Sequence, residues 1–111
     1  MHEMGITQSI VAIVAEQAHG RRVKRVTLEI GALSAVMPDA IRFCFDAVVK
    51  GGALDGAALD IVEIPGRARC LDCGEEIALN DIVGRCHCGS ARLDRFAGQE
   101  LNIKSMEVEI A

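Results

Sequence analysis

Four of the chain's five cysteines fall into two close pairs, and their spacing constrains the fold more than any other feature of the sequence. Two residues separate Cys70 from Cys73, and twelve residues further on a single residue separates Cys86 from Cys88. Four thiolates in two close pairs can surround one ion tetrahedrally, which suits Zn²⁺. A glycine follows each pair and allows the backbone to bend around the sulfur atoms. The pattern predicts a small zinc-binding module that resembles a zinc ribbon.

The second pair is one residue shorter than the first, which leaves two ligand sets open. If Cys88 keeps the second position of the turn, Arg85 stands where the first thiolate is expected. Cys86 then binds from a tighter turn, or His87 replaces one thiolate. We expect zinc ligation by all four cysteines, with His87 as the alternative. Free structural thiols are a weaker alternative, because buried inert cysteines do not normally come as two spaced pairs. Redox chemistry at the first pair is another, but redox pairs belong near a βαβ pattern, which is absent here.

The predicted zinc site is structural. Four protein ligands leave no open position for a substrate or a water molecule. The fifth cysteine, Cys44, lies outside the cluster on the predicted apolar face of a helix, where a buried hydrophobic role is expected.

The rest of the chain alternates between helical and strand patterns. Apolar residues recur at helical spacing from Met4, with Thr7 on the polar side, and predict a helix that stops at His19-Gly20. Period-two alternation predicts a strand over residues 25–30, and Pro38 opens a second helix.

Two further strands are predicted at residues 58–64 and 101–110. The second of these follows the cysteine-rich segment, so we expect it to rejoin the body. We therefore predict an α+β fold, with two helices on a three-stranded sheet and an inserted zinc-ribbon-like domain. The body comprises residues 1–66 plus 99–111, and the insertion comprises residues 67–98.

Composition and charge exclude several classes of protein. Half of the residues are hydrophobic and the formal net charge is −4, which does not fit a disordered chain. No stretch approaches the ~20 apolar residues that cross a bilayer. The first twenty residues lack the basic segment of a secretory signal. We therefore expect a cytoplasmic protein without membrane contact, in which the thiols remain reduced.

The N-terminal residues Met1, His2 and Glu3 form a second candidate metal site. The α-amine, the amide nitrogen of His2 and its imidazole can form adjacent chelate rings around one cation. Glu3 can add an oxygen, which gives the tetragonal N,O set that suits Ni²⁺ or Cu²⁺. His2 is bulky, so we expect the initiator methionine to remain. On these residues alone the hypothesis is weak, because an exposed histidine near a chain start is usually no ligand.

Several segments together resemble the HypA family of nickel metallochaperones, in the same order along nearly the whole chain. They are MHEMGITQSI at the start, VTLEIGALSAVMPDAIRFCFDAVVKG, CLDCGEE, CGSARL and LNIKSMEVE. The resemblance implies an α+β nickel-binding domain with a zinc-ribbon domain. It implies nickel binding by His2, with Met1 and Glu3 as auxiliary ligands, and zinc binding by Cys70, Cys73 and Cys88. The family usually has two residues between the cysteines of its second pair, so Cys86 departs from the pattern.

The resemblance also implies a function and its partners. The chain is expected to deliver Ni²⁺ during maturation of NiFe hydrogenase, with the maturation GTPase HypB and the immature hydrogenase large subunit as partners. We expect a monomer or weak homodimer that is not an enzyme.

The principal alternative is a zinc ribbon that binds nucleic acid through the basic run at residues 21–25. Against it stand the net charge and the insertion, which has five basic and five acidic residues in 67–98. A metal-dependent hydrolase is the weakest alternative, since no open zinc position or catalytic triad is evident. We therefore expect no nucleic-acid partner.

Overall fold

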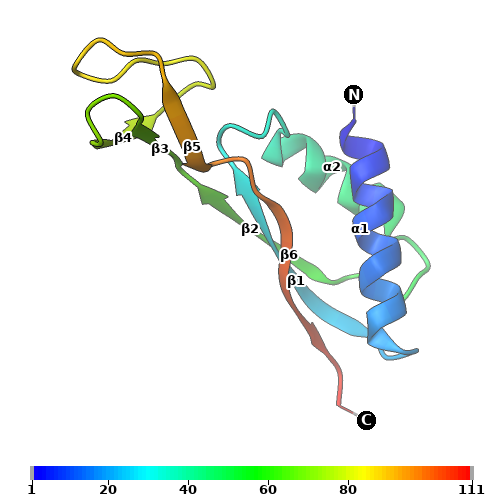
Figure 1. Cartoon of the computed structure of the whole chain (residues 1–111). Coiled ribbons are helices and arrows are strands. Elements are labelled where there is room, and N and C mark those ends of the chain that lie inside the picture. The colour runs from blue at the N-terminus through cyan, green and yellow to red at the C-terminus, as the bar shows by residue number, and fades with distance from the viewer. Residues whose placement is uncertain (1, 111) are drawn as a thin grey trace. The chain divides into compact units, whose positions relative to one another are not determined.

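The computed structural model of the protein describes residues 2–110, which form two helices and six strands (Figure 1). In chain order these are α1 (Glu3–Ala18), β1 (Val23–Gly31), α2 (Pro38–Val48), β2 (Ala58–Ile64), β3 (Gly66–Cys70), β4 (Glu76–Leu79), β5 (Leu93–Ala97) and β6 (Leu101–Val108). Three strands form one sheet in the order β2-β1-β6, and the other three form a second sheet in the order β4-β3-β5. The α+β fold and the return of the last strand to the body are confirmed.

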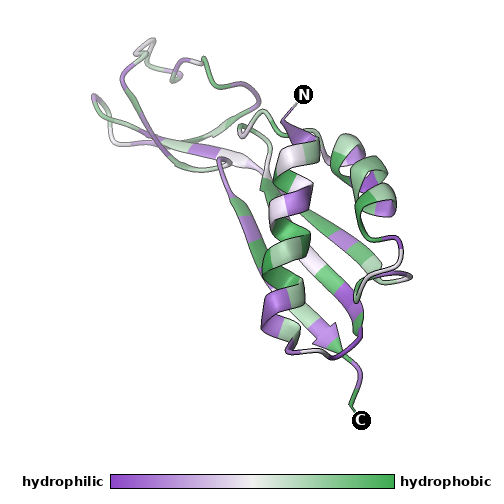
Figure 2. Cartoon of the chain, turned by 90° about the vertical axis from the view of Figure 1, so that its right-hand side faces the viewer, coloured by the Kyte–Doolittle hydropathy of each residue, from purple (hydrophilic) through white to green (hydrophobic). Residues whose placement is uncertain are grey.

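Both helices lie on the same face of the β2-β1-β6 sheet, as Figures 1 and 2 show from two directions. Hydrophobic residues concentrate in the middle of α1 and hydrophilic residues at its ends (Figure 2). The residues that α1 buries follow a repeat of three and four positions and are Glu3, Thr7, Ile10, Val14 and Ala18. Among the described residues, no helix combines the length and the apolar character needed to cross a membrane.

The sequence assigned Thr7 to the polar side of α1, and this was wrong. Its side chain is 1% exposed, and its hydroxyl donates a hydrogen bond of 2.6 Å to the carbonyl oxygen of Glu3. A threonine hydroxyl can satisfy its polar group within its own helix in this way, so the methyl group can be buried without an unpaired donor.

Helix α2 begins at Pro38, as predicted, because proline has no N–H to leave unpaired in the first turn. Ile41, Cys44 and Phe45 form its buried face. The thiol-bearing Cys44 is 8% exposed, in agreement with its predicted role as a small buried hydrophobe.

The β4-β3-β5 sheet carries the cysteine-rich segment. Strand β3 pairs antiparallel with β4 on one side and with β5 on the other. Strand β5 was not predicted from the sequence. The buried residues associated with this sheet form one small hydrophobic cluster, which consists of Leu33, Ala68, Cys70, Ile77, Leu79, Cys86 and Leu93.

The chain divides into two compact units. One comprises residues 1–28, 36–62 and 102–111, and the other comprises residues 29–35 and 63–101. The first contains both helices and the second contains all four paired cysteines.

Residues 29–35 join the cysteine-bearing unit through a close approach of backbones. A Cβ atom on Gly31 would overlap the carbonyl group of Gly98, and one on Gly98 would lie 2.6 Å from Cα of Gly66. Gly98 has a φ of 108°, which side chains rarely adopt, and its carbonyl oxygen accepts a 2.6 Å hydrogen bond from the N–H of Leu33. Glycine is therefore required for the segment with Leu33 to pack into this unit.

Candidate metal centres

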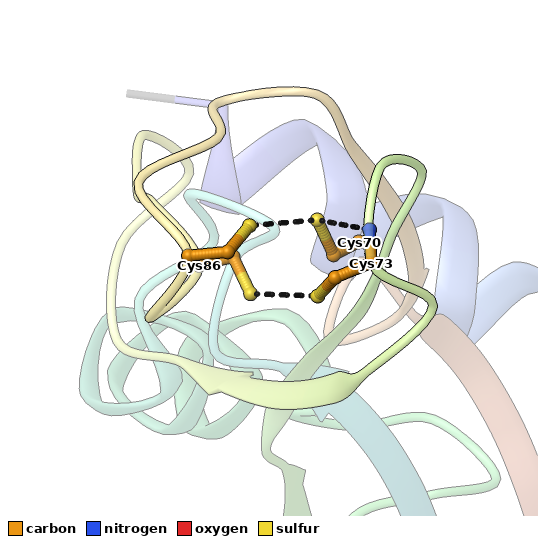
Figure 3. A group of neighbouring side chains, drawn as sticks. Cys70, Cys73 and Cys86 are labelled. Carbon is orange, nitrogen blue, oxygen red and sulfur yellow. Dashed lines mark hydrogen bonds between the residues drawn. The ribbon is translucent and has the colours of Figure 1, made fainter.

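The four paired cysteines converge on one point, as the sequence predicted. Their sulfur atoms all lie within 4.8 Å of one another. The Sγ atoms of Cys70 and Cys88 are 3.7 Å apart, and those of Cys73 and Cys86 are 3.5 Å apart. Figure 3 shows the labelled side chains of Cys70, Cys73 and Cys86 directed into the same space. A tetrahedron with Zn–S bonds of ~2.3 Å has sulfur–sulfur edges of about 3.8 Å, so this donor set fits Zn²⁺.

Two short turns place the sulfur atoms. In the first, the N–H of Gly74 donates to the carbonyl oxygen of Cys70 at 2.9 Å, and Gly74 has a φ of 78°. In the second, the N–H of Gly89 donates to the carbonyl oxygen of Cys86 at 2.9 Å, and Gly89 has a φ of 92°. Each glycine adopts the left-handed conformation that reverses the chain after its cysteine pair. One cysteine in each pair is buried and the other is exposed.

The shorter second pair still directs both of its sulfur atoms into the cluster. Cys86 is 4% exposed and belongs to the cluster, whereas no histidine nitrogen does so among residues 2–110. Arg85, which occupies the position expected for a thiolate, instead donates from Nη1 to the carbonyl oxygen of Gly89 at 2.9 Å. The tighter turn therefore brings the sulfur of Cys86 into the cluster, although only one residue separates Cys86 from Cys88.

The thiols of the metal-free cluster differ in acidity. The N–H of Cys73 lies 3.5 Å from Sγ of Cys70, and this contact is the main reason that the pKa of Cys70 falls to about 6. The backbone of Glu75 acts to lower the pKa of Cys73, but the neighbouring Cys86 thiol and burial outweigh it and raise that pKa to about 12. The backbone of Ser90 likewise acts to lower the pKa of Cys88, yet the sulfur of Cys70 and burial raise it. At neutral pH Cys70 is therefore the most readily ionised of these three thiols.

The N-terminal candidate site lies at the start of α1. His2 is exposed and occupies the N-cap position, where its side chain makes no capping hydrogen bond. Its carbonyl oxygen accepts the helix hydrogen bond from the N–H of Ile6 at 2.9 Å. Met1, predicted as an auxiliary ligand, lies outside the described residues.

Glu3, the other predicted auxiliary ligand, is only 8% exposed. Its Oε2 accepts a 3.2 Å hydrogen bond from the N–H of Met37, the N-cap residue of α2. The α-amino group, and then the backbone N–H groups of Glu3 itself and of Met37, lower the pKa of Glu3 to about 2. The carboxylate is therefore ionised at neutral pH beside His2.

Sequence reasoning missed a polar network beside the cysteine cluster. Asp72, Ser90 and Arg92 make hydrogen bonds with one another, and each lies within four residues of a clustered cysteine. The sequence did contain a signal for this network, because the acidic Asp72 lies inside the first cysteine pair and the basic Arg92 follows the second.

Comparison with known proteins identifies the family of the chain. Residues 1–108 match the family described as hydrogenase/urease nickel incorporation, metallochaperone, hypA. The chain is 62% identical over 109 residues to the hydrogenase maturation factor HypA of Trichormus variabilis, covering 98% of this chain and 96% of the relative. It is 49% identical to the HypA of Geobacter metallireducens, with 98% and 100% covered.

The fold agrees with this match. The solution structure of the Ni metallochaperone HypA from Helicobacter pylori superposes with a TM-score of 0.67 at 27% identity, covering 97% of both chains. The family match, the close relatives and the shared fold lead to the same conclusion, that this chain belongs to the HypA family of hydrogenase/urease nickel-incorporation metallochaperones.

Proposed function

We propose that this chain carries Ni²⁺ on its N-terminus and delivers it during maturation of NiFe hydrogenase. The observation that carries the proposal is the position of His2, exposed at the first turn of α1 in a chain that belongs to a nickel metallochaperone family. The imidazole and amide nitrogens of His2 and the α-amine of Met1 supply the nickel ligands, with oxygen from Glu3 as an auxiliary. A site at a chain end can exchange ligands one at a time, which suits a carrier that must release its cargo.

The start of a helix supports metal binding by backbone nitrogen. The first N–H groups of an α-helix have no carbonyl partner within the helix. His2 is the N-cap of α1, and only its carbonyl takes part in the helix, by accepting a hydrogen bond from the N–H of Ile6. The amide N–H of His2 is not used by the helix. When a metal ion binds this nitrogen, the amide proton passes to solvent, and no hydrogen bond of the helix is broken.

The cysteine cluster has a different role in this proposal. Cys70, Cys73, Cys86 and Cys88 bind one structural Zn²⁺ in the inserted domain, residues 67–98, whereas nickel belongs to the α+β body, residues 1–66 plus 99–111. The sulfur–sulfur distances of 3.5 and 3.7 Å support a closed four-thiolate site. A closed site retains its ion and leaves no position for substrate, so the chain acts as a carrier and not as an enzyme.

Substitution of His2 tests the nickel site. His2→Gln removes the imidazole but keeps a bulky second residue, so processing of the initiator methionine is not altered. Calorimetric titration should show loss of stoichiometric Ni²⁺ binding, with zinc content and circular dichroism unchanged. His19→Asn is the matched control, because His19 is exposed at the other end of α1 and asparagine tolerates its φ of 52°. Nickel affinity that survives in His2→Gln would overturn the assignment.

The partners follow from the same proposal. We propose that the chain acts in the cytoplasm as a monomer or weak homodimer and docks with the maturation GTPase HypB and the immature hydrogenase large subunit. Membership of a family whose relatives are hydrogenase maturation factors supports this choice over a nucleic-acid-binding ribbon. In a reconstituted transfer assay, His2→Gln should still bind both partners but should transfer no nickel. Transfer at the wild-type rate would contradict the proposed route.

A further inference from the structure

The two cysteine turns are joined by a polar network that involves no sulfur atom. Asp72 lies between Cys70 and Cys73 in the first turn, whereas Ser90 and Arg92 follow the second turn. Arg92 donates from Nη1 to Oδ1 of Asp72 at 2.7 Å, and the hydroxyl of Ser90 donates to Oδ2 of the same carboxylate. Both carboxylate oxygens of Asp72, in the first turn, therefore accept hydrogen bonds from the segment that follows the second turn.

Backbone groups extend this network toward the sulfur ligands. The N–H of Arg92 donates to Oγ of Ser90 at 3.0 Å, so the hydroxyl both donates and accepts. The N–H of Cys86 donates to the carbonyl oxygen of Ser90, and the N–H of Leu71 donates to that of Arg92, at 2.9 and 2.8 Å. A backbone hydrogen bond therefore holds each turn at a clustered cysteine or at the residue next to one.

We propose that Asp72, Ser90 and Arg92 form a clamp that holds the two cysteine turns together independently of the metal ion, and that this clamp controls the rate of zinc release. The inference rests on the proposed zinc site. With the clamp closed, a competing chelator meets four thiolates whose separation the clamp opposes. Once it opens, the turn with Cys86 and Cys88 can move away and the ion is lost stepwise.

Exposure of the clamp limits how large its effect can be. The side chains of Arg92 and Asp72 are 70% and 43% exposed, and such ion pairs add little to global stability. Zinc release, however, requires no global unfolding. It requires only that the two cysteine turns separate locally, and the clamp opposes this separation. Outer-shell groups that hydrogen-bond to metal ligands change metal affinity by roughly 10- to 100-fold. The clamp contacts no sulfur atom and solvent screens its ion pair, so we expect the low end of this range, about tenfold in the release rate.

The test measures zinc transfer from the loaded full chain to a chromogenic chelator in excess. Asp72→Asn should release zinc about tenfold faster than wild type, because it loses the charge but keeps the shape of the side chain. Arg92→Gln should accelerate release similarly. The double variant should release zinc no faster than the quicker single variant, since both remove the same interaction.

A matched control exists in the same unit. Arg69 and Glu76 form an ion pair of 3.2 Å with exposures of 54% and 45%, close to those of the clamp, but both lie in the β3–β4 hairpin. Glu76→Gln should therefore keep the wild-type release rate. Added salt should speed release from wild type but not from Asp72→Asn, because screening weakens only an intact charge pair.

Cobalt substitution separates positioning from ligation. The Co²⁺ absorption spectrum of Asp72→Asn should match that of wild type, because all four thiolates remain. If Asp72→Asn fails to fold, Ser90→Ala removes one hydroxyl of the clamp and should still accelerate release. Wild-type protein that binds no stoichiometric zinc would refute the proposed site itself. Wild-type release rates in folded, zinc-loaded Asp72→Asn or Ser90→Ala would refute the clamp alone.

Discussion

Glu3 and Met37, thirty-four positions apart, are joined by a 3.2 Å hydrogen bond from the backbone N–H of Met37 to the carboxylate of Glu3. The bond links the first residue of α1 to the N-cap of α2. A carboxylate at this position also complements the positive end of the α2 dipole. The residue that follows His2 is therefore fixed against the second helix, which orients the first turn of α1 and the proposed nickel site on it.

This bond predicts how the protein responds to acid. The pKa of Glu3 is about 2, below its usual value near 4.5, because the α-amino group and the N–H groups of Glu3 and Met37 favour the charged form. The stabilisation is therefore complete above about pH 4.5 and is lost as the pH falls through about 2. The Met37 amide resonance should show no titration between pH 7 and pH 4 by NMR. A midpoint near 4.5 at this amide would contradict the account.

Zinc uptake should release protons. At pH 7 the raised pKa values keep Cys73 and Cys88 protonated, whereas Cys70, with a pKa of about 6, is largely ionised. Binding must therefore displace at least the protons of Cys73 and Cys88, so zinc affinity should rise with pH through neutrality. Calorimetry of zinc binding in buffers of different ionisation enthalpy measures the number released. Release of fewer than two protons per zinc would be incompatible with these thiol states.

Gly98→Ala should destabilise the cysteine-bearing unit. The new Cβ would lie 2.6 Å from Cα of Gly66 at a φ of 108°, and neither backbone can give way easily. We expect a loss of about 3 kcal/mol in urea unfolding, from strain and overlap together. Gly56→Ala is the control, because Gly56 has a φ of 81° but a Cβ added there would meet no atom within 4 Å. It should cost only about 1 kcal/mol, and equal losses would argue against the close backbone approach.

Cys44 should be separable from the zinc site. Cys44→Ala removes a buried sulfur from the apolar face of α2 and should lower stability by about 1 kcal/mol, with no change in zinc content. Cys73→Ser, by contrast, removes a cluster sulfur and should lower zinc affinity by orders of magnitude. Zinc content by atomic absorption and unfolding by urea distinguish the two effects. Zinc loss in Cys44→Ala would contradict the assignment of zinc to the other four cysteines alone.

Much of this structure follows from local sequence patterns. Pro38 marks the start of α2, and residues 58–64 form β2 with the predicted bounds, because both signals depend on neighbours along the chain. The convergence of Cys70, Cys73, Cys86 and Cys88 was also predictable, since cysteine spacing reflects a geometric demand of the metal ion.

Other features depend on contacts that no local pattern contains. Strand β5 is predicted poorly, because Asp94 and Arg95 interrupt its apolar residues and the strand exists through pairing with β3. The burial of Glu3 depends on Met37, which lies far along the chain. The same holds for Asp72, whose partners Ser90 and Arg92 follow the other cysteine turn.

We propose that two ions occupy two chemically distinct sites, and X-ray absorption at the nickel and zinc edges of the doubly loaded protein distinguishes them. The nickel edge should show nitrogen and oxygen ligands with imidazole scattering and no sulfur, and the imidazole contribution should disappear in His2→Gln. The zinc edge should show four sulfur atoms at ~2.3 Å in both proteins. Sulfur at the nickel edge, or a nickel spectrum that is unchanged in His2→Gln, would contradict the account.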